Sequence, residues 1–159
     1  MKRLLMSVFL AALAAIGTAS VVSAASADPI IGNWKLNLAK SVFAGIPAPK
    51  SQTRTYSGSA PEFTLVMVSV SAEGKRTTTR ATYQLNGKDF SSMGNSDFDS
   101  LSGVQIDTNT AEFVLKRAGK PVGKIRRAVS ADGKTLTINF LLTNADGVQT
   151  SSVSVFDRQ

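Results

Sequence analysis

The side chains that most often perform enzymatic chemistry are absent from this sequence. It contains no histidine and no cysteine, which removes the commonest general base, the thiolate nucleophile and the usual zinc ligands. Serines and threonines are numerous, but without a histidine none has an evident base to activate it. We therefore predict no catalytic residue and a protein that is not an enzyme.

The eleven Asp and Glu residues do not form a recognisable metal site. Glu73, Asp132 and Asp146 belong to predicted turns, and Asp97 and Asp99 lie in or beside a loop. The pair Asp97-x-Asp99 lacks the other ligands and the spacing of a calcium loop. We predict no metal and no cofactor.

Arg127 has the clearest potential for binding chemistry. Strand alternation places it on an inward face between Ile125 and Val129, where an unpaired guanidinium is unfavourable. It either holds the anionic group of a ligand, or pairs with a neighbouring carboxylate or reaches solvent at the rim. Tyr83 is the second inward polar group, and its hydroxyl bonds either a ligand or the backbone.

Strands and tight turns must position these side chains. From residue 51 onward, short runs rich in Val, Ile, Thr and Phe alternate with turns that contain Gly74, Gly87, Gly119, Gly133 and Gly147. This pattern predicts an all-β, antiparallel up-and-down meander of about eight to ten strands. Closure into a single β-barrel removes the exposed sheet edges, whereas a two-sheet sandwich needs longer crossovers.

The turns also predict which residues face each other in the second half of the chain. A two-residue turn at residues 132–133 places Arg127 opposite Ile138 and Ile125 opposite Phe140. The same rule at residues 146–147, and a three-residue turn at residues 118–120, extend this pairing on both sides. The result is an inward apolar row of Phe113, Ile125, Phe140 and Val153.

The first half of the chain predicts an inward face of mostly small residues. Two-residue turns at residues 73–74 and 86–87 give the pairs Val68 with Thr79, Val66 with Ala81, and Tyr83 with Phe90. Small inward residues favour a cavity, unless Met and Phe side chains from elsewhere fill it. This register turns Phe63, Leu65 and Met67 outward, where the segment 38–49 covers them or they form an interaction surface.

Residues 1–27 have the pattern of a signal peptide. Lys2 and Arg3 precede an apolar run, and Ala25-Ser-Ala27 provides a small-residue cleavage site. A retained membrane anchor is the alternative, but no positive stop-transfer flank follows. We expect residues 28–159 to form one domain in the periplasm or outside the cell, with no transmembrane span.

The formal net charge of +7 falls to +5 when Lys2 and Arg3 are removed. The basic residues are scattered along the predicted strands, which is typical of solvated faces. We therefore expect no nucleic-acid partner. An anionic partner of an exported protein would be a small acid, a polysaccharide or a lipid headgroup, including peripheral contact with the envelope.

The motif Gly32-Asn-Trp34, followed by Lys35-Leu36, resembles the Gly-x-Trp start of the lipocalin and fatty-acid-binding-protein superfamily, the calycins. The resemblance implies that Gly32 and Trp34 close one end of the barrel, and Arg158 is a candidate partner across the indole ring. The stretch 31–41, the Ser130-Ala-Asp-Gly-Lys134 turn and the Val155-Phe-Asp-Arg158 ending also resemble exported bacterial lipocalin-like proteins of unassigned function.

The sequence departs from the fatty-acid-binding proteins at two points. These proteins hold the ligand carboxylate with an Arg-x-Tyr pair near the C-terminal strand, and Phe156-Asp-Arg158 supplies no such pair. Their helix-turn-helix lid also needs more residues than the segment 37–50 offers.

The sequence therefore predicts an extracytoplasmic binding protein for a small apolar or amphiphilic molecule, with an anionic ligand as one option. The alternative is a non-enzymatic interaction module with a filled core, which contacts an envelope component through Leu65, Met67 and the basic strand faces. The two differ in cavity volume. The candidate ligand-binding residues are Val66, Val68, Thr79, Ala81, Tyr83, Phe113, Ile125, Arg127, Ile138 and Phe140.

Overall fold

The computed structural model describes residues 28–92 and 97–159, so the predicted signal peptide lies outside the described residues. Within them, no helix is both long and apolar enough to cross a bilayer. The one helix of this part is a single 3₁₀ turn, η1 (Leu38–Lys40). The strands are β1 (Gly32–Leu36), β2 (Val42–Ala44), β3 (Ser51–Ser59), β4 (Glu62–Val70), β5 (Arg76–Gln84), β6 (Asn86–Ser91), β7 (Ser100–Asp107), β8 (Thr110–Arg117), β9 (Lys120–Val129), β10 (Thr135–Thr143) and β11 (Gln149–Arg158).

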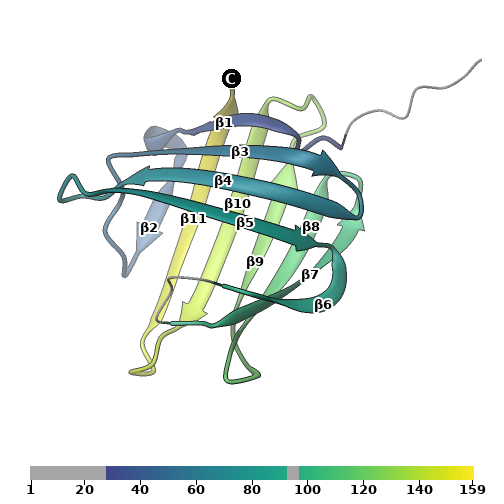
Figure 1. Ribbon diagram of the computed structural model, residues 1–159. Coiled ribbons are helices and arrows are strands. Elements are labelled where there is room, and N and C mark those ends of the chain that lie inside the picture. The colour runs from purple at the N-terminus through teal and green to yellow at the C-terminus, as the bar shows by residue number, and fades with distance from the viewer. Residues whose placement is uncertain (1–27, 93–96) are drawn as a thin grey trace, which may run out of the picture.

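The strands form one antiparallel meander wrapped into a nearly closed barrel, which confirms the predicted fold class. Neighbours follow the order β5-β4-β3-β1-β11-β10-β9-β8-β7-β6, and the short β2 pairs with β11. In Figure 1, β3, β4 and β5 cross in front of β9, β10 and β11 at a steep angle and enclose the interior. Because β5 and β6 are the two ends of this order, the barrel of described strands stays open along the seam between them.

The predicted pairing of β8, β9 and β10 is confirmed. Arg127 faces Ile138 and Ala111, and Ile125 faces Phe140 and Phe113. The turn after β8 contains two residues, Ala118 and Gly119, both with positive φ. A bulge opposite Leu115 and Lys116 adds one residue to β9. The pairs from Leu115 back to Thr110 therefore have the register that a three-residue turn would give.

The predicted pairing of β10 with β11 is wrong by one residue. Phe140 faces Ser152 instead of Val153. The loop closes between Asn144 and Val148, which leaves three residues in the turn instead of two. Since a one-residue shift exchanges the two faces of a strand, Ser152 points inward and Val153 is 38% exposed.

The same error affects the pairing of β4 with β5. This loop closes between Ser71 and Lys75 and again holds three residues. Phe63, Leu65 and Met67 face Tyr83, Ala81 and Thr79 in turn. The predicted outward apolar patch is therefore wrong: its three side chains lie on the inner face, and Phe63 is buried in the core.

Residues 86–87 do not form the predicted hairpin turn. The chain bends after β5, and Gly87, with a φ of +77°, lies where the pairing of β6 with β7 shifts between Asn86 and Asp89. Tyr83 and Phe90 are consequently not ladder partners across the seam. Their rings still stack, with centroids 5.5 Å apart, so side chains bridge the place where main-chain hydrogen bonds are missing.

The end of the barrel near residues 30–34 is filled by Trp34. Its ring is fully buried, and its Nε1 donates to the carbonyl oxygen of Ile30 at 2.8 Å. The Arg158 guanidinium lies over the ring, 4.2 Å from its centroid, and donates to main-chain carbonyls at residues 29, 31 and 133. Gly32 has a φ of +131°, and a Cβ there would lie 2.7 Å from Arg158 Nη1, so only glycine fits without displacing Arg158.

Candidate ligand-binding site

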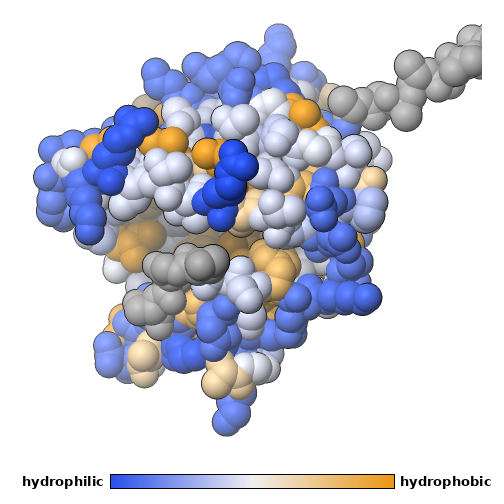
Figure 2. Space-filling model, viewed as in Figure 1, coloured by the Kyte–Doolittle hydropathy of each residue, from blue (hydrophilic) through white to orange (hydrophobic). Residues whose placement is uncertain are grey.

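An open cavity of about 780 Å³ lies inside the barrel. This volume lies within the range of small-molecule sites, so the barrel does not have the filled core of the alternative interpretation. Figure 2 shows a hollow on the face that carries β5, with hydrophobic residues at its floor and hydrophilic side chains beside it. Eight of the ten predicted ligand-binding residues line the cavity: Thr79, Ala81, Tyr83, Phe113, Ile125, Arg127, Ile138 and Phe140.

Val66 and Val68 do not line the cavity. The three-residue loop between β4 and β5 places both on the outer face, opposite Arg80 and Thr78. Their inward positions belong to Leu65 and Met67, which line the cavity instead. This replacement makes the wall larger and more apolar than the sequence predicted.

The segment between β1 and β3 lies at the cavity, and not over an outer patch. Val42 and Phe43 of β2 pair with Val153 and Ser152 of β11. Side chains from this segment contribute to the lining: Phe43, Ile46, Pro47 and Pro49. The segment contains only a short 3₁₀ turn and a three-residue strand, in keeping with the expectation that it is too short for a helix-turn-helix.

Arg127, from the middle of β9, extends into the cavity and is only 4% exposed. Its Nη1 donates to the hydroxyl of Tyr83 at 2.7 Å. Its guanidinium lies 5.5 Å from the ring centroid of Tyr56 and 5.7 Å from that of Phe113. These aromatic faces stabilise the buried cation, so Arg127 neither pairs with a carboxylate of the described residues nor reaches out past the rim.

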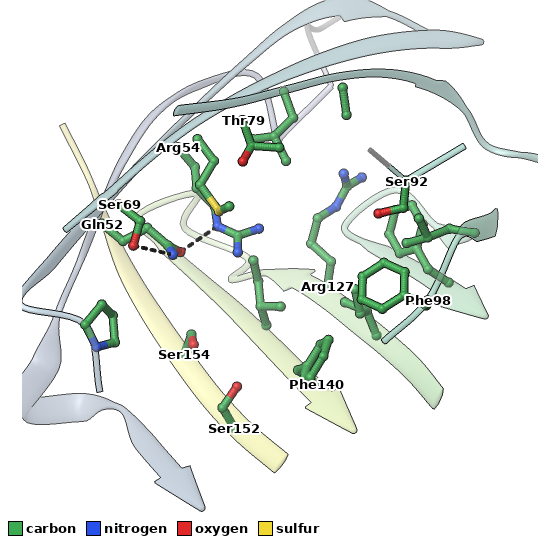
Figure 3. A pocket seen from close by; sticks show the side chains of 18 of the residues that line it. Gln52, Arg54, Ser69, Thr79, Ser92, Phe98, Arg127, Phe140, Ser152 and Ser154 are labelled. Carbon is green, nitrogen blue, oxygen red and sulfur yellow. Dashed lines mark hydrogen bonds between the residues drawn. The ribbon is translucent and has the colours of Figure 1, made fainter. Parts of the chain in front are cut away.

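A second arginine, Arg54 of β3, extends into the same space and was not predicted (Figure 3). Its Nε donates to Gln52 Oε1 at 3.0 Å, its Nη1 lies 3.4 Å from the Tyr56 hydroxyl, and its guanidinium packs over the Phe156 ring at 5.1 Å. Tyr56 thus contacts both arginines, through its hydroxyl on one side and its ring on the other.

The polar end of the cavity, where Arg54, Tyr56, Tyr83 and Arg127 meet, is rich in hydrogen-bond donors. The three ion pairs of the described residues involve neither Arg54 nor Arg127. Arg54 Nη2 and the Nε and Nη2 of Arg127 make no hydrogen bond within the described chain, yet no fully buried side-chain N or O of this part lacks a partner. These N–H groups are therefore open to whatever occupies the cavity.

Tyr83 remains a neutral hydroxyl under all ordinary conditions. Burial raises its pKa to about 12, against the opposing effect of the Arg127 charge. Because its oxygen accepts from Arg127, its own proton is free to be donated. An anion beside Arg127 would therefore receive hydrogen bonds from both the guanidinium and the phenol.

The remainder of the lining is apolar with a strip of hydroxyl groups. Leu65, Met67, Ile138 and Phe140 form apolar wall, while Ser152 and Ser154 of β11 point into the cavity (Figure 3). The described residues contain no group of three or more Asp and Glu side chains that could hold a metal ion. The arrangement suits a molecule with one charged end and an apolar body.

The sequence carried one signal that would have revealed Arg54 and Tyr56. The Arg-x-Tyr pattern that the C-terminal strand lacks is present as Arg54-Thr-Tyr56, flanked by the small polar residues Thr53 and Ser57. Along this part of β3 the large residues Arg54 and Tyr56 face inward, and the small residues between and beside them face outward. Polarity alone predicts the opposite orientation for Arg54, because charged side chains usually face solvent.

The fold is similar to those of proteins of known structure, although no sequence relative was found. No protein-family model matches the chain, and no curated protein matches it either. Among solved structures, it is similar to zebrafish ileal bile acid-binding protein complexed with cholic acid, with a TM-score of 0.55 and 13% identity over 82% of this chain and 99% of that one. It is also similar to As-p18, an extracellular fatty acid binding protein, with a TM-score of 0.53 and 12% identity over 84% of this chain and 98% of that one.

These similarities show the fold: the chain forms a β-barrel similar to those of the bile acid-binding protein and the fatty acid binding protein. At identities of 12–13%, the structural similarity establishes the architecture and says nothing about the ligand of this protein. The chemistry of the cavity must therefore be argued from the residues that line it.

Proposed function

We propose that this protein is a non-enzymatic binding protein, exported from the cytoplasm, whose barrel holds a small amphiphile with an anionic headgroup. The headgroup lies against Arg127, Tyr83 and the Arg54–Tyr56 pair, and the apolar body lies along Leu65, Met67, Ile138 and Phe140. The similar solved structures include a bile acid-binding protein and a fatty acid binding protein, which supports a ligand in the barrel.

One observation carries the proposal. Arg127 is a fully charged side chain that is 4% exposed, has no ion-pair partner among the described residues and faces a cavity of about 780 Å³. A buried charge without a counter-ion is unfavourable, and a neutral phenol compensates it only in part. An anionic ligand removes this deficit, whereas a neutral one does not.

Calorimetric titration of the purified protein with decanoate and with decanol tests the proposal, since the two share a chain length and differ in charge. We expect decanoate to bind more tightly. Arg127→Gln should lower the affinity for decanoate about 10- to 100-fold, because a hydrogen bond to a charged group contributes about 1.5–3 kcal/mol. The affinity for decanol should change little.

Arg126→Gln is the matched control. Arg126 precedes Arg127 in β9, is exposed, and pairs with Glu112 on the outer surface at 3.1 Å. This variant should bind both probes as the parent does. If the parent binds decanoate and decanol equally, or if Arg127→Gln leaves decanoate affinity unchanged, the anionic site is excluded.

Export rests on the sequence of residues 1–27, with Lys2 and Arg3, an apolar run and Ala25-Ser-Ala27. Expression of the full chain in a bacterium, followed by mass spectrometry of the periplasmic and secreted fractions, should find a protein that begins at Asp28. Recovery of the uncut chain in the membrane fraction would instead identify an anchor. Contact with an envelope component stays a prediction.

A further inference from the structure

Three arginines line the cavity, and two of them, Arg54 and Arg127, meet at Tyr56, whereas the third, Arg80, belongs to β5. Arg54 and Arg127 both point into the cavity (Figure 3), and both contact Tyr56. The lining holds one carboxylate, Glu73, which belongs to the exposed loop between β4 and β5 and bonds to Ser71. A headgroup placed at Tyr56 is therefore close to two guanidinium groups that lack a counter-ion within the described chain.

A monoanion neutralises only one of these two charges. The other guanidinium stays uncompensated in a partly desolvated site, where electrostatic interactions are stronger than in water. Arginine remains protonated throughout the accessible pH range, so the protein cannot relieve this by losing a proton. A headgroup with two negative charges matches the site.

The donors also match the shape of such a headgroup. Arg54 Nη2, Arg127 Nε and Arg127 Nη2 have no hydrogen-bond partner in the part of the chain that the structure describes. The phenols of Tyr56 and Tyr83 accept from the arginines and keep their own protons to donate. A phosphate monoester presents three terminal oxygens and a double charge on one compact group. Arginine forks bind such oxygens in pairs.

We propose, building on the function given above, that the cavity selects a phosphate monoester of an apolar chain over a monoanionic amphiphile. The phosphate lies between Arg54 and Arg127 with Tyr56 and Tyr83 as further donors, and the chain lies along the apolar wall. Decyl phosphate and decyl sulfate are the matched probes, because both are tetrahedral and carry the same chain. The sulfate has one charge at every pH, whereas the phosphate loses its second proton near pH 6.

Titration calorimetry of the parent protein at pH 5 and pH 8 separates the two charge states. The sequence has no histidine, so no side chain with an ordinary pKa titrates in this interval. In the cavity lining, burial raises the pKa of Tyr83 to about 12 and the Ser71 hydroxyl lowers the pKa of Glu73, so both shifts move these groups away from the interval. A change in affinity therefore reports the proton of the ligand.

We expect decyl phosphate to bind about tenfold or more tightly at pH 8 than at pH 5, and decyl sulfate to bind equally at both. At pH 8 decyl phosphate should exceed decyl sulfate by a similar factor. Inorganic phosphate should bind at least about 100-fold more weakly than decyl phosphate, because it forgoes burial of the chain. Equal binding of inorganic phosphate would identify a free-phosphate site and overturn the inference.

Single variants test whether both guanidinium groups are needed to prefer the doubly charged headgroup. Arg54→Gln and Arg127→Gln should each abolish the preference for phosphate over sulfate and the rise with pH, since one guanidinium remains, while Arg126→Gln keeps both. Equal affinity of the parent for decyl phosphate and decyl sulfate at pH 8 overturns this inference and leaves the proposed function intact. If no anionic amphiphile binds, both fail, and neither result depends on how well a variant folds.

Discussion

At the scale of single residues, the protein surrounds a buried cation, Arg127, and a half-buried one, Arg54, with aromatic rings and hydroxyl groups. Arg127 is held by Tyr83, Tyr56 and Phe113, and Arg54 by Tyr56 and Phe156. None of these partners removes the charge. The proposed anionic ligand would supply the negative charge that these partners lack.

Arg158 is a cation with the opposite role, since all its interactions are internal. Arg158→Ala removes the donor to the carbonyls of residues 29, 31 and 133 and the cation over Trp34. We expect the free energy of unfolding to fall by about 2–4 kcal/mol. Urea unfolding followed by the fluorescence of Trp34, the single tryptophan, measures it.

The exposed Arg126 again supplies the control for Arg158. Arg126→Ala loses one surface ion pair and should lower the free energy of unfolding by less than about 1 kcal/mol. Equal losses for the two alanine variants would show that Arg158 does not hold the barrel end together.

At the scale of elements, the turns decide what the cavity contains. Ser71-Ala-Glu-Gly-Lys75 and Ser130-Ala-Asp-Gly-Lys134 look alike, and in both the glycine N–H donates to the serine carbonyl. The first closes between Ser71 and Lys75, the second between Ser130 and Thr135, so their loops differ by one residue. That single residue brings Leu65 and Met67 into the cavity in place of Val66 and Val68.

The loop between β10 and β11 depends on one side chain. Asn144 Oδ1 accepts from the N–H groups of Asp146 and Val148 at 3.0 and 2.9 Å. Asn144→Ala removes this acceptor, and we expect it to lower the free energy of unfolding by about 1–2 kcal/mol. Chemical denaturation measures the change.

Asn144→Asp retains the acceptor oxygen and should lose less than half as much. If the alanine and aspartate variants are equally destabilised, the side-chain bonds do not stabilise this loop.

At the scale of the whole molecule, the ionisable groups divide into two sets. Arginine side chains keep their charge in the accessible pH range, and the carboxyls with a shifted pKa lie in turns or near strand ends. Hydrogen bonds lower the pKa of these carboxyls: Asn37 that of Asp157, the Ala118 N–H that of Asp99, Ser130 that of Asp132, the Asn109 N–H that of Asp107 and Ser71 that of Glu73.

This division predicts how stability depends on pH. Because these carboxyls have lower pKa values in the folded state, the unfolded chain binds protons first, and their contribution is lost as pH falls through about 4 and below. With no histidine, stability should be nearly constant between pH 5 and 8. Thermal unfolding of the ligand-free protein measures this dependence, and a melting temperature that rises below pH 4 would contradict it.

The sequence by itself determined the features that depend on local patterns. Alternation and glycine turns determined the all-β meander, the motif at Gly32 and Trp34 indicated the end of the barrel that Trp34 fills, and phase along one strand oriented Arg127 inward. Each of these follows from neighbours a few residues away, so it needs no knowledge of the rest of the chain.

Only the tertiary structure decided the register of two hairpins, the open seam between β5 and β6 and the meeting of Arg54 with Arg127. A glycine marks a turn, but the backbone groups that close it set the loop length, and one residue more or less reverses a whole strand. Arg54 and Arg127 lie on strands far apart in sequence, β3 and β9, and share Tyr56 only because the barrel curls back on itself. Barrel closure depends on contacts between residues far apart in the sequence. It brings Arg54 and Arg127, from distant strands, into one candidate binding site.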